Sequence, residues 1–324
     1  MPELPEVEHL RRSLEPWLIG GRFGRVVIGR RDVINSAPPH KVCANPRDAL
    51  ERALLVNSLI VATHRHGKQL ALESETGAVL VVQLGMTGSL GFERGSPPRG
   101  VEGRHRHLRW EFSPNPNVRL DGNSTASKSA TSSSHDESRL WRFVFRDPRR
   151  FGGVTCFASM AELRASWNKL GPDALTIDAR ALAAELQGSR RPVKAALLDQ
   201  GTVAGIGNIY ADESLYAAKI HPCAPAGDLR PAQITILAAQ LRRILAGAVV
   251  AGGSTLRDYR DAFGQPGSAV QTHLAYGRAG LPCARCSQAL VSQQVAGRTT
   301  TYCPTCQPST YPHASGDAET SGFH

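Results

Sequence analysis

The most specific indication of the fold is the sequence of residues 283–306, CARCSQALVSQQVAGRTTTYCPTC. The cysteines form two C-x2-C pairs separated by 16 residues, and thiolates at this spacing close a tetrahedral zinc site from two tight turns. Sulfur fills all four positions, so none stays open for water and we expect one structural Zn²⁺. The stretch between the pairs is typical of a two-stranded hairpin. The expected zinc ligands of this zinc-finger hairpin are Cys283, Cys286, Cys303 and Cys306.

Zinc hairpins serve nucleic-acid binding and scaffolding alike, so the cysteines alone do not indicate which function the protein has. The 324 residues hold 38 Lys and Arg against 28 Asp and Glu, a formal charge of +10, which favours a polyanionic partner. We see no signal-like apolar start and no stretch near the roughly 20 apolar residues that a membrane span needs. The other three cysteines are Cys43, Cys156 and Cys223. Because an odd number cannot all be paired within the chain, they argue against a secreted disulfide framework. We expect a cytoplasmic protein without a membrane partner.

Short β-rich runs between Gly and Pro turns fill residues 22–157, which predicts a β-sandwich or barrel-like domain. The expected strands are 25–28, 58–64, 77–84, 108–112, 139–145 and 152–157. A helix precedes them, and Pro16 is expected to bend or end it. The apolar positions that indicate this helix are Val7, Leu10, Leu14 and Leu18. A second helix is expected at 46–55, with Asn45 as its cap and Pro46 at its first position.

The rest of the chain is predicted to be helical up to the zinc finger. Ser159 and Glu162 form a capping box, and further helices are expected at 179–187, 192–200, 207–218 and 231–251. The segment 113–138 is polar and Ser-rich, so we expect a disordered insertion. The predicted fold class is therefore α+β with several domains. They are an N-terminal β-sandwich domain with flanking helices at 1–157, a helical domain at 158–264, a loop and the zinc finger at 265–306, and a disordered tail at 307–324.

The opening MPELPEVE carries candidate chemistry. An initiator Met before Pro is usually removed, which would leave Pro2 as a free secondary amine. Such an amine can attack the anomeric carbon of a sugar and form an iminium, while a carboxylate such as Glu3 or Glu6 moves protons. The same residues also suit an ordinary helix start, with Pro and Glu in the first turn. On spacing alone, the helix start is the commoner explanation.

Seven segments, in one order from residue 2 to residue 306, resemble the bacterial formamidopyrimidine-DNA glycosylase family. They are PELPEVE at 2–8, HRHGKQL around Lys68, QLGMTGSL at 83–90, DPRRFGG at 147–153, GIGNIYADESLYAAKIHP at 205–222, AYGRAGLPC at 275–283 and the four cysteines. PELPEVE, unlike PEGPE, points to this branch and away from the related endonuclease VIII branch. The resemblance implies a helix-two-turn-helix fold for the helical domain.

The resemblance also implies an activity. The family's enzymes act in base excision repair on double-stranded damaged DNA, remove 8-oxoguanine and formamidopyrimidines, and cut the strand by β,δ-elimination. A Schiff base on the N-terminal proline carries this chemistry, so no organic cofactor is expected. We expect a monomer.

The residue roles implied by the resemblance fall into two groups. Pro2 is the nucleophile, Glu3 the acid/base beside it and Lys68 the essential lysine, and the matched catalytic positions are completed by Glu6 and Arg298. Met86, Arg149 and Phe151 match the triad that fills the gap left by an everted base. The matched DNA contacts also include His105, Arg150 and Asn208, and Arg298 is expected to hold phosphate.

One departure leaves the lesion range open. The family commonly has Tyr-Phe after the Pro-Gly of its lesion loop, whereas Pro266-Gly267 is followed here by Ser268-Ala269. A superfamily member that prefers oxidised pyrimidines is therefore an alternative. A non-catalytic binder of damaged DNA would require the loss of Pro2, Glu3 or Lys68. A zinc-ribbon transcription protein would explain the cysteines and the charge, but not the N-terminal segments.

Overall fold

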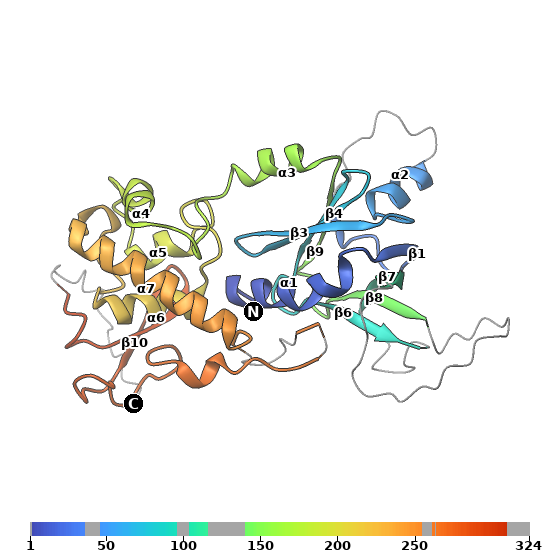
Figure 1. Cartoon of the computed structure of the whole chain (residues 1–324). Coiled ribbons are helices and arrows are strands. Elements are labelled where there is room, and N and C mark those ends of the chain that lie inside the picture. Colours follow the sequence, from blue (N-terminus) through green and yellow to red (C-terminus); the bar gives the residue numbers. More distant parts are fainter. Residues whose placement is uncertain are drawn as a thin grey trace, which may run out of the picture.

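The computed structural model describes residues 2–35, 46–95, 104–115, 140–254, 261–262 and 264–309 (Figure 1). A lobe of β-sheets and a lobe of helices lie on either side of the N-terminal helix α1 (Leu4–Leu18). Most of the insertion expected at 113–138 and of the tail expected at 307–324 falls outside the described residues. The Asn45 cap also falls outside them, next to α2 (Pro46–Ala53).

Two sheets share one apolar core, which confirms the expected sandwich. The four-stranded antiparallel sheet has the order β1 (Arg22–Ile28), β7 (Arg106–Ser113), β8 (Trp141–Arg146) and β6 (Ser89–Arg94). The five-stranded sheet has the order β2 (Ile34–Asn35), β9 (Gly153–Phe157), β5 (Val79–Gln83), β4 (Gln69–Ser74) and β3 (Ile60–His66). Sequence reasoning missed β2, β4 and β6. In β4, three consecutive residues (Leu70, Ala71, Leu72) are buried, so the alternation that marks a half-exposed strand is absent.

Helix α1 belongs to both lobes. Leu4 packs in the core of the helical lobe, whereas Val7, Leu10 and Leu14 pack in the core of the sandwich. The helix continues through Pro16 and ends two residues later at Leu18, so the proline ends it only in the last turn. The start of the chain is therefore fixed at the junction of the two lobes.

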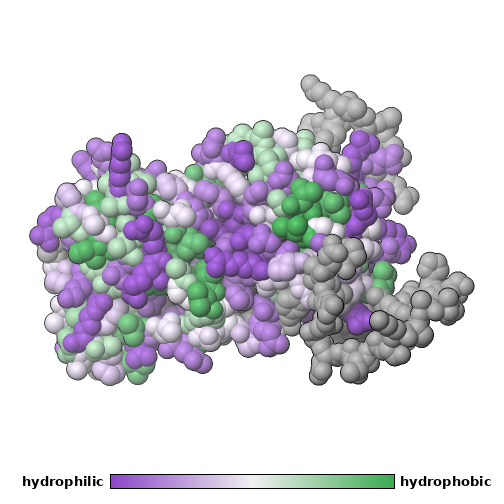
Figure 2. All heavy atoms as spheres, viewed as in Figure 1, coloured by the Kyte–Doolittle hydropathy of each residue, from purple (hydrophilic) through white to green (hydrophobic). Residues whose placement is uncertain are grey.

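A buried arginine strengthens this junction. Arg65, at the end of β3, donates to the Glu8 carboxylate of α1 at 2.9 Å. Its other nitrogens donate to both carboxylate oxygens of Asp173, just before the helical lobe, at 2.5 and 2.9 Å. Hydrophilic residues cover the middle of this face, between the two lobes (Figure 2).

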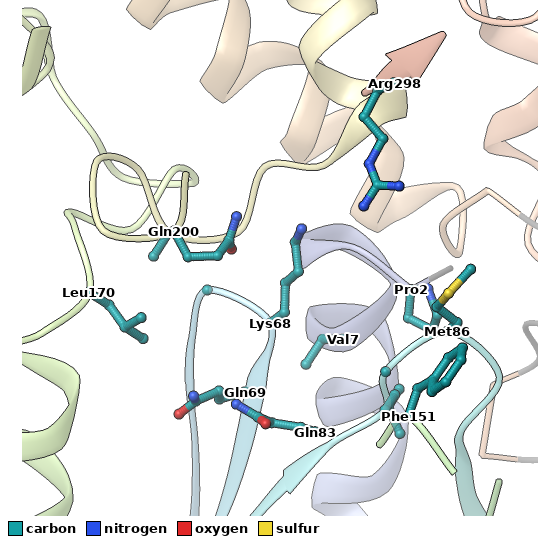
Figure 3. Close-up of a pocket in the computed structure, with 14 residues that line it drawn as sticks. Pro2, Val7, Lys68, Gln69, Gln83, Met86, Phe151, Leu170, Gln200 and Arg298 are labelled. Atoms are coloured by element: carbon teal, nitrogen blue, oxygen red, sulfur yellow. The ribbon is translucent and has the colours of Figure 1, made fainter. Parts of the chain in front are cut away.

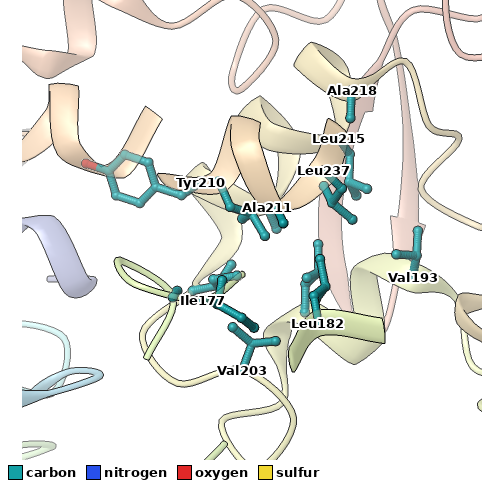
Figure 4. Packing of buried hydrophobic residues seen from close by; sticks show 14 of the residues in the cluster. Ile177, Leu182, Val193, Val203, Tyr210, Ala211, Leu215, Ala218 and Leu237 are labelled. Atoms are coloured by element: carbon teal, nitrogen blue, oxygen red, sulfur yellow. The ribbon is translucent and has the colours of Figure 1, made fainter. Parts of the chain in front are cut away.

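The helical lobe is built around α6 (Asn208–Ala218) and α7 (Pro231–Val250). Its other helices are α4 (Ala179–Leu186), α5 (Val193–Leu198) and the short η3 (Ala226–Asp228) and η4 (Ala269–Thr272). Helix α3 (Met160–Trp167) instead packs on the five-stranded sheet, where Leu163 is buried with Val79 and Val81. Figure 4 shows how Leu182, Ala211 and Leu237 meet in the core. Ser159 caps α3 by accepting from Glu162 N at 3.2 Å, as its sequence predicts.

Helix α7 differs from expectation in its hydropathy. Over an 18-residue window its mean hydropathy is 1.3, so it is long and apolar enough to cross a membrane by length and composition. The expectation that no stretch approaches a membrane span in length and hydropathy is therefore wrong for α7. Leu237, Leu241 and Leu245 of α7 are buried in the core of the helical lobe, and α7 contacts α1, α4 and α6. A core helix of a folded domain meets the same length and composition test, so the hydropathy has a structural explanation.

The zinc-finger hairpin, β10 (Val291–Val295) and β11 (Arg298–Tyr302), is hydrogen-bonded to a buried ion pair of the helical lobe, between Lys194 of α5 and Asp212 of α6. Lys194 Nζ lies 2.6 Å from Asp212 Oδ1, and the two side chains are 0% and 1% exposed. Lys194 also donates to Thr300 Oγ1 at 2.7 Å, and Thr301 N donates to Asp212 Oδ2 at 2.9 Å. Burial raises the pKa of Asp212 to about 6 and lowers that of Lys194, against their mutual attraction. The pair thus holds the hairpin on α6.

Removal of one partner of this pair should destabilise the fold strongly. Asp212→Ala leaves a buried, uncompensated ammonium, and we expect a loss of about 3 kcal/mol in the free energy of unfolding. Urea denaturation monitored by circular dichroism measures it. The double variant Lys194→Met/Asp212→Leu is the matched control and should recover much of the loss. A double variant as unstable as Asp212→Ala would contradict the explanation by an unpaired charge.

Candidate active site

A cavity of about 440 Å³ lies at the junction of the two lobes (Figure 3). It brings together five of the candidate residues from distant parts of the chain: Pro2, Lys68, Met86, Phe151 and Arg298. Pro2 precedes α1, Lys68 lies in the turn between β3 and β4, and Arg298 begins β11. A reacting group in this cavity would therefore face residues from both lobes.

Glu3 follows Pro2 in the chain, and its carboxylate caps the start of α6. Oε2 accepts from Gly207 N at 2.8 Å and Oε1 accepts from Ile209 N at 3.0 Å. A Cβ atom at position 207 would lie 2.3 Å from the Glu3 carboxyl carbon, so only glycine allows this approach. Burial and the charge of Glu6 raise the pKa of Glu3 to about 7, although Lys68 and the two amides lower it. A carboxyl group with this pKa exchanges protons readily near neutral pH.

Glu6 is held by three donors. Its Oε2 accepts from Glu3 N at 2.8 Å, which fixes the first turn of α1. Its Oε1 accepts from Tyr210 Oη at 2.7 Å and from Ser254 N at 2.6 Å. The Ser254 hydroxyl continues the network to Tyr210 Oη at 3.2 Å and to His273 Nε2 at 2.9 Å. Glu6 therefore connects α1 to α6 and, through Ser254, to His273.

Lys68 points its ammonium toward the turn before α6, where Nζ donates to Ile206 O at 2.8 Å. Gln200 braces the same turn, because its Nε2 donates to Ile206 O and its Oε1 accepts from Gly205 N, each at 2.9 Å. Burial lowers the pKa of Lys68, whereas the charges of Glu3 and Glu6 raise it. The Lys68 ammonium is thus desolvated beside two carboxylates.

Two large apolar side chains stand at the rim of the cavity. Met86 is 40% exposed and Phe151 is 58% exposed, although both are large and hydrophobic. The guanidinium of Arg149 stacks on the Phe151 ring, with Cζ 4.6 Å from its centroid. Exposure of a thioether and an aromatic ring is costly in water, which suits a surface that inserts into another apolar layer.

Asn208 and Arg298 lie close together through the zinc-finger hairpin. Asn208 is the first residue of α6, and its Nδ2 donates to Thr299 O at 3.0 Å, one residue from Arg298. Arg298 is exposed and follows the tight turn Ala296-Gly297, in which both residues have positive φ. A helix N-terminus beside an exposed arginine can bind a phosphate.

Six candidate residues do not line the cavity: Glu3, Glu6, His105, Arg149, Arg150 and Asn208. Arg150 pairs with Asp32 at 2.8 Å, with both side chains about half exposed. His105 is exposed, and its carbonyl oxygen accepts from Asp147 N at 3.1 Å. Sequence reasoning also missed Tyr210 and Gln200, because their roles depend on partners far away in the chain.

The four cysteines fit a zinc ion. Their Sγ atoms all lie within 4.8 Å of one another, and four thiolates about 2.3 Å from one Zn²⁺ stand roughly 3.8 Å apart. Backbone amides support two of them, because Arg285 N donates to Cys283 Sγ at 3.5 Å and Cys306 N to Cys303 Sγ at 3.4 Å. All four positions are sulfur, which fits a structural ion.

Loss of one thiolate should release the zinc and unfold the hairpin. Cys303→Ser removes a buried ligand, and the free energy of zinc binding is also folding energy of such a module. Metal analysis should find less than one zinc per chain, and affinity for duplex DNA should fall because Arg298 loses its support. The matched control is Cys156→Ser, a buried cysteine outside the cluster. Full zinc content in Cys303→Ser would contradict the ligand set.

The raised pKa of Glu3 should make the free energy of unfolding depend on pH. This pKa is about 7 in the folded chain against an ordinary 4.5, so the folded state binds more protons between these values and stability falls as pH rises from about 4.5 to about 7. Urea midpoints at several pH values measure this, on a chain that retains Met1 so that the Pro2 nitrogen stays uncharged. Glu3→Gln should flatten the dependence in this window, whereas exposed Glu185→Gln should not. An unchanged dependence in Glu3→Gln would refute the raised pKa.

Family models match most of the chain. The model of the formamidopyrimidine-DNA glycosylase N-terminal domain matches residues 1–154, and that of the formamidopyrimidine-DNA glycosylase H2TH domain matches residues 170–260. The zinc finger found in FPG and IleRS matches residues 280–308.

Similar proteins cover nearly the full length. A formamidopyrimidine-DNA glycosylase of Thermomicrobium roseum is 38% identical over 315 residues, covering 95% of this chain and 99% of that protein. The crystal structure of the MutM (FPG) protein from Thermus thermophilus has a TM-score of 0.72 at 35% identity, covering 94% of this chain and 98% of that one. A Lactococcus lactis FPG mutant in complex with Fapy-dG-containing DNA has a TM-score of 0.78 at 28% identity, covering 95% of this chain and 100% of that one. The chain belongs to the formamidopyrimidine-DNA glycosylase family.

Proposed function

We propose that this glycosylase excises oxidised purines from duplex DNA and cuts the strand at the resulting site, with Pro2 as nucleophile. The observation that carries the proposal is that Pro2 and Lys68 both line the 440 Å³ cavity. Glu3, the next residue after Pro2, is buried and bound to the start of α6. Structures of similar proteins contain Fapy-dG DNA and 8-oxo-G DNA, which supports the same substrate class. AP lyase activity is typical of the family.

The proposed reaction starts after removal of Met1. The lone pair of the Pro2 nitrogen attacks C1′ of the damaged nucleotide, and the base leaves with the electrons of the glycosidic bond and takes up a proton. The sugar ring opens, and an iminium forms between the Pro2 nitrogen and C1′. The iminium acidifies the C2′ protons, so loss of one of them expels the 3′ phosphate, and a second elimination expels the 5′ phosphate. Glu3, with a pKa of about 7, is suited to move the protons.

The proposed DNA contacts follow from the cavity rim. Met86, Arg149 and Phe151 would fill the space left by the everted nucleotide. The exposed apolar groups of Met86 and Phe151 gain by entering the base stack, and the planar guanidinium of Arg149 can hydrogen-bond the orphaned base. Asn208 and Arg298 would hold a phosphate beside the cavity. We assign His105 and Arg150 to phosphate contacts outside the cavity, where Arg150 would exchange Asp32 for DNA.

We propose the domain division 1–157, 158–264 and 265–306, with the zinc ion supporting the hairpin that carries Arg298. We also propose that the enzyme acts as a monomer in the bacterial cytosol, on the nucleoid.

The lesion preference has one specific competitor. Ser268 and Ala269, which follow Pro266-Gly267, have small side chains. The backbone is fixed here, because Ser268 N donates to Ala251 O at 2.8 Å. Without aromatic side chains at these positions, the loop offers less stacking surface to a purine. An enzyme that accepts oxidised pyrimidines is therefore the second candidate.

Borohydride trapping tests both the nucleophile and the substrate class. Duplexes carrying 8-oxoguanine, formamidopyrimidine, thymine glycol or 5-hydroxycytosine are incubated with the enzyme, and borohydride reduces the iminium to a stable amine. We expect faster trapping with the two purine lesions, and peptide mass analysis should place the adduct on Pro2 with Met1 absent. Faster trapping with the two pyrimidine lesions would favour the second candidate.

N-terminal variants provide the control for this experiment. Retention of Met1 converts the amine into an amide, so both trapping and cleavage should be abolished. Lys68→Ala should lower the rate but still give an adduct on Pro2. Wild-type turnover by a chain shown to keep Met1, or an adduct found only on Lys68, would overturn the mechanism.

A further inference from the structure

We propose that Asp147 is a positioning residue that holds two turns, which carry Met86, Arg149 and Phe151, together as one rigid unit. The first turn, Gly85–Thr87, connects β5 to β6 and carries Met86; the second, Asp147–Gly152, connects β8 to β9 and carries Arg149 and Phe151. The inference rests on the proposed function of these three side chains as the wedge. It assigns a role to a buried carboxylate that does not itself reach the DNA.

The Asp147 carboxylate bonds both turns at once. Its side chain is 0% exposed. Oδ1 accepts from Thr87 Oγ1 of the first turn at 2.5 Å and from Arg149 N of the second at 3.2 Å. Oδ2 accepts from Gly152 N at 2.7 Å, just after Phe151. The hydroxyl of Thr87 completes a triangle, because it also accepts from Arg149 N at 3.2 Å.

The backbone of Asp147 is also fixed. His107 of β7 is 3% exposed, and its Nε2 donates to Asp147 O at 2.7 Å. Asp147 N donates to His105 O at 3.1 Å. The carboxylate therefore projects from a backbone position that is held by β7 and by the residue just before it, and its orientation is determined by the sandwich.

The two turns also touch through their glycines. Gly85 has φ +59°, and a Cβ atom there would lie 2.4 Å from Phe151 C. A Cβ atom at Gly152 would lie 2.4 Å from Gln83 O, just before the first turn. Backbone contact this close leaves no room for a side chain between the turns, so hydrogen bonds across the contact determine their relative position.

The chemistry of the wedge explains why rigidity matters. Unstacking a base step costs a few kcal/mol, so the duplex tends to restack, and side chains that fill the gap of an everted base must resist this tendency. A wedge on two independent turns would yield to this force, because each turn would move separately. A carboxylate suits the lock because both of its oxygens accept, whereas an amide offers one acceptor and would turn its NH₂ toward either Thr87 or the Gly152 amide.

The test compares a damaged base with a site that has already lost its base. Asp147→Asn should slow single-turnover excision of 8-oxoguanine about tenfold, because the lock loses a charged hydrogen bond. Cleavage of a preformed abasic site should change by less than about twofold, because unstacking is partly complete there. A 2-aminopurine base next to the lesion should brighten more slowly, since the wedge enters the stack later. Thr87→Val should act in the same direction, and Thr87→Ser should restore the wild-type ratio of the two rates.

Controls separate this inference from loss of stability and from failure of the proposed function. Asp178→Ala removes a carboxylate that caps α4, far from the wedge, and should leave the ratio of the two rates unchanged at any loss of stability. Equal losses on both substrates in Asp147→Asn would overturn the positioning role. Met86→Ala and Phe151→Ala should themselves favour the abasic substrate. If they do and Asp147→Asn does not, only this inference fails; if they do not, the wedge function fails.

Discussion

The seating of the Glu3 carboxylate on the first turn of α6 is the contact on which the site depends. The start of a helix presents unpaired N–H groups and a partial positive charge, so it binds a carboxylate well. Here the two donors are Gly207 N and Ile209 N, more than 200 residues away in the chain. Because Glu3 is the N-cap of α1, this contact fixes Pro2 relative to the helical lobe. Leu4 then enters the helical core, and the later apolar residues of α1 enter the sandwich core: Val7, Leu10, Leu14 and Leu18.

The same contact tunes the chemistry of the carboxyl group. Full burial would leave an isolated carboxylate protonated, while the two amides and Lys68 favour its charged form. The balance is a pKa of about 7, between the two extremes. Glu6 has a different environment, since its oxygens accept from Glu3 N, Tyr210 Oη and Ser254 N. Glu3 is therefore suited to proton exchange and Glu6 to anchoring.

The sequence predicted those features whose determinants are local. The C-x2-C pairs, the Ser159 cap of α3 and the β-rich runs each carry their signal within a few residues, and the structure contains all three. Strand β4 was missed because both of its faces are buried, which removes the period of two. The matched segments brought Lys68 and Met86 into consideration, but no pattern indicated that both would face Pro2.

Residues that act through distant partners escaped prediction for a physical reason. Tyr210 looks like an ordinary core aromatic in α6, and only the fold brings its hydroxyl to Glu6. Asp147 looks like the first residue of a solvated turn, yet it is fully buried between two loops. A side chain's hydrogen-bond partner across the fold is set by tertiary packing, and one sequence carries no direct record of that packing.

The structure also bears on which of the two amines at the cavity is the better nucleophile. Burial lowers the pKa of Lys68, which favours its neutral amine form, and an N-terminal amine has an ordinary pKa of roughly 8. The Lys68 ammonium, however, already donates to Ile206 O at 2.8 Å, and attack on a sugar would require that bond to break. A lysine imine must also stay protonated to withdraw electrons. The iminium of a secondary amine has no N–H to lose, so it keeps its positive charge through each elimination. Pro2 therefore suits the covalent role, and Lys68 suits the stabilisation of negative charge beside it.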